Sequence, residues 1–161
     1  MSRKLQTRGR FPVPPESMLV VMTDPELLKR QHRMQGAIEV DVQERERNAG
    51  SLVIKVAVRE YWRNLKGIDK NRIEDAETSY TWNLSEHSCK WRYRGPRGDM
   101  VRISGAIDIE PAEEGCLVLS EVTVHVPVPI LGGMLEKRIA GEIEAGFAPF
   151  EELLLEFCKD A

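Results

Sequence analysis

The histidines are the first side chains to consider for chemistry, because an imidazole can act as a general base near neutral pH. His125 follows Glu121 and Thr123 at intervals of four and two residues, so the three share one face if this segment is a strand. Side chains four residues apart on a strand lie beyond hydrogen-bond reach of each other. Their shared face is also opposite to the valine-rich one. The spacing therefore favours a surface histidine near a surface carboxylate over a catalytic pair.

The other residue types that could act as metal ligands or nucleophiles also lack a suitable spacing. His32 falls on a charged segment and His87 in a turn, and neither has a second ligand at the interval of a metal site. Cys89, Cys116 and Cys158 are widely separated and form no CxxC pair. We expect reduced thiols, as in a cytoplasmic protein, and no metal, no cofactor and no catalytic nucleophile.

Composition and charge predict one domain over residues 1–161. The chain is 42% hydrophobic and 30% charged, with 23 Lys and Arg against 26 Asp and Glu, a net charge of −3. This balance argues against nucleic-acid binding, which usually requires a basic excess. The longest uncharged stretch, residues 122–135, is shorter than the roughly 20 apolar residues of a transmembrane segment. One cluster of basic residues is predicted to serve solubility, and transient contact with an anionic membrane surface stays open as the alternative. The cluster comprises Lys90, Arg92, Arg94, Arg97 and Arg102.

Strands are predicted wherever apolar and polar residues alternate between turn-forming residues. The connections between the last six runs, residues 67–71 among them, permit only antiparallel neighbours, because a parallel crossover needs a dozen or more residues. The later part of the chain is therefore a predicted meander. The expected strands cover residues 3–11, 37–46, 52–62, 72–84, 88–94, 100–110 and 116–126.

Helical spacing appears in two places. Two short helices are expected after the first strand, over residues 15–22 and from Pro25 to near Gly36, the second capped by Asp24. Apolar residues spaced by four predict a long C-terminal helix from about Leu131, with a kink or restart near residues 145–149 because of Pro149. The predicted fold class is α+β: a curved seven-stranded antiparallel sheet wrapped around that helix.

The faces of the predicted hairpins gather aromatic residues on one side of the sheet. Closing residues 72–94 through a turn at 85–88 puts Trp82 opposite Trp91 and Tyr80 opposite Tyr93. Closing residues 100–126 puts Gly105 opposite Ser120, and closing 37–62 puts Val42 opposite Leu52. Gly105 and Ser120 would then leave a hollow in the middle of the sheet. The C-terminal helix could fill that hollow or be held off by the aromatic residues, and close packing alone favours a solid core.

The order of elements resembles the helix-grip fold of the START-like (SRPBCC) superfamily, which includes birch-pollen-allergen-like proteins, polyketide cyclases and lipid-transfer domains. Residues 122–139, VTVHVPVPILGGMLEKRI, resemble the VPVPLLGxxxE passage of a bacterial branch known only as a domain of unknown function. FPVPPESM at residues 11–18 and TDPE at residues 23–26 also fit that branch. The resemblance covers nearly the whole chain. It implies a deep pocket for an apolar molecule between the sheet and the last helix, and so favours a pocket over a solid core.

The resulting hypothesis is a non-enzymatic carrier or sensor of a hydrophobic small molecule, such as a lipid, an isoprenoid or a polyketide-like aromatic compound. A cyclase-like or aromatase-like enzyme that uses the same pocket, and an interaction module without a ligand, remain the alternatives. The sequence leaves open whether the protein is a monomer or a homodimer. The expected ligand-binding residues are Tyr80, Trp82, Trp91, Tyr93, Gly105, Ser120, Leu135, Ile139, Ile143 and Phe147.

Overall fold

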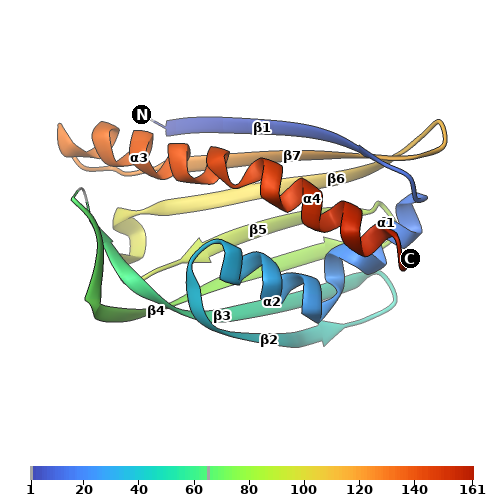
Figure 1. Cartoon of the computed structure of the whole chain (residues 1–161), viewed down its shortest axis with the longest axis horizontal. Coiled ribbons are helices and arrows are strands. Elements are labelled where there is room, and N and C mark those ends of the chain that lie inside the picture. The colour runs from blue at the N-terminus through green and yellow to red at the C-terminus, as the bar shows by residue number, and fades with distance from the viewer. Residues whose placement is uncertain (1, 65) are drawn as a thin grey trace.

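The computed structural model describes residues 2–64 and 66–161, and their order of strands and helices is the predicted one. Seven strands and four α-helices appear, with one short 3-10 turn between the fifth and sixth strands (Figure 1). The elements are β1 (Ser2–Phe11), α1 (Pro15–Thr23), α2 (Pro25–Met34), β2 (Ala37–Arg47), β3 (Ser51–Asn64), β4 (Gly67–Asn83), β5 (Ser88–Arg94), η1 (Gly98–Met100), β6 (Arg102–Ala112), β7 (Gly115–His125), α3 (Leu131–Ala145) and α4 (Phe147–Cys158).

The strands form one antiparallel sheet in the order β1-β7-β6-β5-β4-β3-β2. Strands β2 to β7 follow one another as a meander, which confirms the prediction, and β1 closes the sheet beside β7. The sheet curves, and all four α-helices lie on its inner face (Figure 1). Alternation explains this arrangement: along β3 the even-numbered residues from Leu52 to Val58 are buried, whereas their odd-numbered neighbours are half-buried or exposed.

The register of the hairpins differs from the predicted one by two or four residues. Trp82 pairs with Cys89, Tyr80 with Trp91, and Thr78 with Tyr93, so the predicted Trp82–Trp91 pair is wrong. A slip by an even number of residues keeps every side chain on its face, so the hydrophobic pattern cannot detect it. The four-residue loop of this hairpin begins at Leu84, one residue earlier than expected, and this shift sets the register.

The same kind of slip changes the two other predicted hairpins. Gly105 pairs with Val122 and not with Ser120, because strand pairing continues through Pro111 to Ala112 and leaves only a two-residue turn. Val42 pairs with Val56 and not with Leu52, because β2 contains irregularities that residue patterns do not reveal.

The β3–β4 connection is also tighter than predicted. Residues 67–71 were expected as a turn, but β4 begins at Gly67 and pairs with β3 from there. The register jumps between Tyr61, which pairs with Ile73, and Trp62, which pairs with Asp69. Residues 70–72 therefore bulge from the ladder, so the polar segment forms an irregularity within a long hairpin.

The helices follow their sequence signals. The Asp24 side chain accepts a hydrogen bond of 2.9 Å from the Glu26 amide, and Pro25 occupies the first turn of α2, as predicted. The C-terminal helix restarts at Gly146. Pro149 is the third residue of α4, where a backbone N–H has no partner within the helix, so proline is tolerated there. Among the described helices, none is long and apolar enough to cross a bilayer.

Candidate functional site

The inner face of the sheet has a packed half and an open half. In the packed half, Trp82, Cys89 and Ile109 are buried beneath residues of α1, α2 and α4. In the open half, which we define by Trp91, Tyr93, Ile103 and Gly105, the inward residues of β5 and β6 are only half-buried. Strand β5 is the fourth of seven, so this exposure is not an effect of the sheet edge. It indicates that solvent reaches the centre of the sheet on its inner side.

Helix α3 lies beside the open half. Its strand contacts are mainly with β1 and β7, at the opposite side of the sheet from β3 and β4. Glu136 and Ala140 are its buried side chains on that side. The residues of the C-terminal helices that the sequence assigned to the site are half-buried and follow one another along α3 into α4; they are Leu135, Ile139, Ile143 and Phe147.

The aromatic residues assigned to the site divide between the two halves. Tyr80 and Trp91 contact each other, with ring centroids 6.5 Å apart, at the boundary between the halves. Trp82 is 2% exposed and belongs to the packed half. Tyr93 lies in the open half. Ser120 is half-buried on β7, where it pairs with Ile107.

Gly105 makes room for an indole ring. A Cβ built at Gly105 would overlap the six-membered ring and the nitrogen of Trp91. The space at Gly105 that the sequence predicted as part of a hollow is therefore occupied by the ring of Trp91, which lies against β6. The glycine therefore makes space for an aromatic ring rather than leaving a gap.

A buried histidine forms a hydrogen bond with one of the aromatic residues. His32 of α2 and the hydroxyl of Tyr80 share a hydrogen bond of 3.0 Å. Burial lowers the pKa of His32 to about 4 and raises the pKa of Tyr80, so both groups are neutral at pH 7. His32 was predicted to lie on a charged segment. The signal that shows its burial is its spacing of four from Leu28, which puts both on the apolar face of α2.

The Tyr93 hydroxyl provides a polar group in the open half. It donates a hydrogen bond of 2.6 Å to Glu60 of β3. Burial raises the pKa of Tyr93, and the nearby Glu60 carboxylate raises it further. Gly95 allows this placement, because a Cβ there would overlap the tyrosine ring. The phenol therefore stays protonated and is held in one position.

Polar contacts link α3 to the far side of the sheet. Arg63 of β3 donates hydrogen bonds to the Glu142 carboxylate of α3 at 2.8 Å and to the Gln35 carbonyl at 2.7 Å. Arg97 donates to the Arg63 carbonyl, and its guanidinium lies 4.2 Å from the ring centroid of Trp62. These residues close one side of the open half with charged groups. Sequence spacing gave no indication of this link, because its partners lie far apart in the chain.

Residues 122–139 run from the end of β7 through the connection into α3. The buried Glu136 carboxylate accepts a hydrogen bond of 2.8 Å from the Val126 amide. Gly132 allows the helix to approach the strand, because a Cβ there would overlap the Val126 carbonyl oxygen. His125 Nδ1 lies 3.7 Å from the same carboxylate. Glu136 of α3 is therefore an acidic neighbour of His125 that the strand spacing did not indicate. The glutamate and glycine of this passage therefore fix where α3 begins.

The cysteines show no sign of reactivity. All three are free and buried, and burial raises the pKa of Cys89 to about 12. Within residues 2–64 and 66–161, no cluster of three potential metal ligands occurs.

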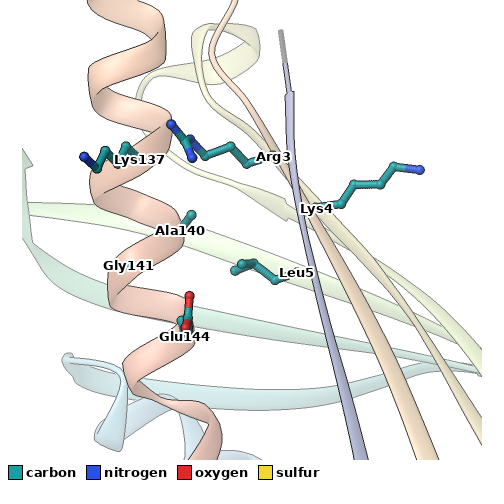
Figure 2. Close-up of a pocket in the computed structure, with 7 residues that line it drawn as sticks. All are labelled: Arg3, Lys4, Leu5, Lys137, Ala140, Gly141 and Glu144. Atoms are coloured by element: carbon teal, nitrogen blue, oxygen red, sulfur yellow. The ribbon is translucent and has the colours of Figure 1, made fainter.

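A separate groove of about 480 Å³ lies between β1 and α3 (Figure 2). The sequence analysis assigned nothing to it. Basic residues are prominent in its lining, which consists of Arg3, Lys4, Leu5, Lys137, Ala140, Gly141 and Glu144.

The fold is shared with several solved structures. TTHA0849 from Thermus thermophilus is 19% identical, with 98% of each chain covered and a TM-score of 0.65. A START superfamily protein from Mycobacterium smegmatis is 15% identical, covering 98% of this chain and 97% of the other, with a TM-score of 0.59. Norcoclaurine synthase from Thalictrum flavum, in complex with dopamine and hydroxybenzaldehyde, is 13% identical over 97% of this chain and 88% of that one, with a TM-score of 0.63.

These likenesses show a START-like helix-grip fold, as the sequence predicted. No curated protein matches the sequence. The model of one family, described as a protein of unknown function (DUF2505), matches residues 6–157. The chain therefore belongs to the DUF2505 family and carries the START-like fold in which the groups described above are arranged.

Proposed function

We propose that the open half of the inner face binds an apolar small molecule that contains a ring. The observation that carries this proposal is the half-buried indole of Trp91 at the centre of the sheet, which lies against Gly105. Trp91 packs against the hydrophobic core but is only partly covered. An aromatic side chain held in this way offers a large contact area at little cost in conformational entropy.

The polar groups around Trp91 would orient such a ligand. The Tyr93 hydroxyl is fixed by Glu60, and the Arg63–Glu142 pair lies toward α3. An apolar wall with a few fixed polar groups is typical of small-molecule sites. Norcoclaurine synthase, which has the same fold, binds ring compounds in its complex with dopamine and hydroxybenzaldehyde, and this supports the proposal by analogy of fold.

A carrier or sensor agrees best with the state of the cysteine thiols and of His32. The three thiols are buried, and His32 is occupied by Tyr80. Catalysis of the cyclase or aromatase kind remains the second candidate, and the Tyr93–Glu60 pair is the observation that favours it. Tyr93→Phe separates the two: a carrier keeps its ligand with modestly changed affinity, whereas an enzyme loses turnover but not binding.

The binding test uses the fluorescent aromatic probe 1-anilinonaphthalene-8-sulfonate. Trp91→Ala should weaken probe binding about tenfold, because about 60 Å² of apolar contact is worth about 1.5 kcal/mol. Leu155→Ala on α4 removes an exposed apolar side chain outside the open half and should leave the affinity unchanged. Equal affinities for wild type and Trp91→Ala would place the probe elsewhere.

The natural ligand is sought by native mass spectrometry of protein purified from its own host. A reproducible added mass that Trp91→Ala loses supports the carrier. Protein that reproducibly carries no added mass supports the interaction module without a ligand.

A further inference from the structure

Exposed large apolar side chains gather at one end of the molecule. Ile130, at the connection between β7 and α3, is 90% exposed, and Leu131 and Met134 beside it on α3 are exposed as well. We call these three residues the apolar tip. The same end carries the β3–β4 hairpin and η1 (Figure 1), where three further exposed apolar residues lie: Ile68, Ile73 and Met100. Among the described residues, this end thus holds six of the ten exposed large hydrophobic side chains.

The backbone of the apolar tip is strained. Ile130 has φ 67° and ψ −59°, and the Leu131 amide donates a hydrogen bond of 2.7 Å to the Pro129 carbonyl. This is a three-residue γ-turn of the rare, strained type, and a β-branched residue is especially unfavourable at positive φ. An isoleucine whose backbone is strained and whose side chain is exposed to water does not stabilise the folded state. Strain of this kind clusters at functional positions.

Positive charge lies directly beside the apolar tip. Arg3 extends from β1 toward α3 across the 480 Å³ groove, whereas Lys4 points away from the helix (Figure 2) and pairs with Glu121. Lys137 follows Met134 by three residues and so lies on the same side of α3. Within the described residues, neither Arg3 nor Lys137 forms an ion pair. The acidic residue of the groove, Glu144, is two turns farther along α3.

The whole end is basic although the chain is acidic. The segments that build it, residues 62–64, 66–74, 97–102 and 125–138, contain eight Lys or Arg and four Asp or Glu, and one of these acids, Glu136, is buried. The net charge of the full chain is −3. Glu142 of α3 balances part of this excess, because it pairs with Arg63 and Arg138. The remaining positive charge lies around the exposed apolar residues.

We propose that this end docks on an anionic lipid bilayer, with the apolar tip inserted among the headgroups and Arg3 and Lys137 against lipid phosphates. Apolar side chains flanked by Lys and Arg are the composition of surfaces that bind in the membrane interface. A turn that protrudes from the protein can insert its side chains between lipid headgroups. A second copy of this chain fits less well, because two-fold pairing of the tips would bring like charges together.

The docked orientation would also place the open half of the inner face next to the bilayer. Arg63 and Arg97, which close one side of the open half, lie at this same end. The docking itself does not depend on the proposed ligand, so failure of one proposal leaves the other standing.

The test measures co-sedimentation of the full chain with phosphatidylcholine vesicles, with and without phosphatidylglycerol. We expect binding only when phosphatidylglycerol is present, and an affinity that falls as salt rises. Ile130→Gly removes the side chain and relieves the positive φ, so it should keep or raise the melting temperature while it weakens binding about tenfold. Lys137→Gln should weaken binding about fivefold.

Two matched variants serve as controls. Val20→Gly removes an exposed apolar side chain from α1, away from the apolar tip, and Lys90→Gln removes a charge from the outer face of β5. Neither should change vesicle affinity. Absence of binding to phosphatidylglycerol vesicles at low salt, or an equal loss in Lys90→Gln and Lys137→Gln, would overturn the proposal. So would sedimentation showing a dimer that Ile130→Gly dissociates, because the apolar tip would then be an interface between copies.

Discussion

The buried pair of His32 and Tyr80 makes a quantitative prediction about stability and pH. His32 is 7% exposed, and burial lowers its pKa to about 4, against about 6.5 in an unfolded chain. The unfolded state therefore binds one more proton than the folded state between these two values. The stability that neutral His32 provides is complete above pH 6.5 and is lost as pH falls toward 4.

The size of the effect follows from the two pKa values. A difference of about 2.5 units corresponds to about 3 kcal/mol when both states are fully protonated, and about 2 kcal/mol of this is already lost at pH 5. His32→Gln keeps a side chain that can hydrogen-bond to the Tyr80 hydroxyl but does not titrate. The contribution of all other groups cancels when the variant is compared with wild type.

The assay is urea unfolding of both proteins from pH 7.5 down to pH 5. Wild type should lose about 2 kcal/mol more than His32→Gln over this range. Parallel pH profiles would refute the inference that His32 is buried in its neutral form. So would an NMR titration in which the His32 imidazole protonates near pH 6.5.

Three further predictions concern single positions. Glu136→Ala should lower the free energy of unfolding by about 1–3 kcal/mol in urea denaturation, because it leaves the buried Val126 amide without its acceptor; an unchanged midpoint would contradict this role. Gly105→Ala should lower stability by about 1–3 kcal/mol and shift tryptophan emission, because the added methyl group displaces Trp91; unaltered emission would show that the ring does not lie on Gly105. Cys89 should resist a thiol reagent at pH 8 until urea unfolds the protein, since burial raises its pKa to about 12, and fast labelling of the native protein would show that it is accessible.

The order and faces of the strands could be predicted because they depend on local alternation. The period of two is regular along residues 52–58 and is read without knowing the partner strand. Helix starts were predictable for the same reason, since the capping group at Asp24 and the proline after it are adjacent in sequence.

Register could not be predicted from the same pattern. Trp91 faces the inner side of the sheet whether it pairs with Trp82 or with Tyr80, and only the position of the turn distinguishes the two. The hollow expected at Gly105 was wrong for this reason. Once Gly105 pairs with Trp91 and Val122, its missing side chain gives space to an indole.

The polar groups of the candidate site depend on contacts between distant segments. Tyr93 of β5 reaches Glu60 of β3 across β4, and Arg63 of β3 reaches Glu142 of α3, so both contacts join segments that lie far apart in the chain. Nothing in their local sequence distinguishes them from other surface residues. His32 is the exception, since its position on the apolar face of α2 was visible in the spacing.

The proposed binding site is tested most directly by the indole N–H signals of the three tryptophans in an NMR titration with 1-anilinonaphthalene-8-sulfonate. Each signal is assigned from the corresponding Trp→Phe variant. The account predicts a saturable shift of the Trp91 signal and little change for Trp82, which lies in the packed half. A Trp91 signal that does not move while the probe binds would contradict the account.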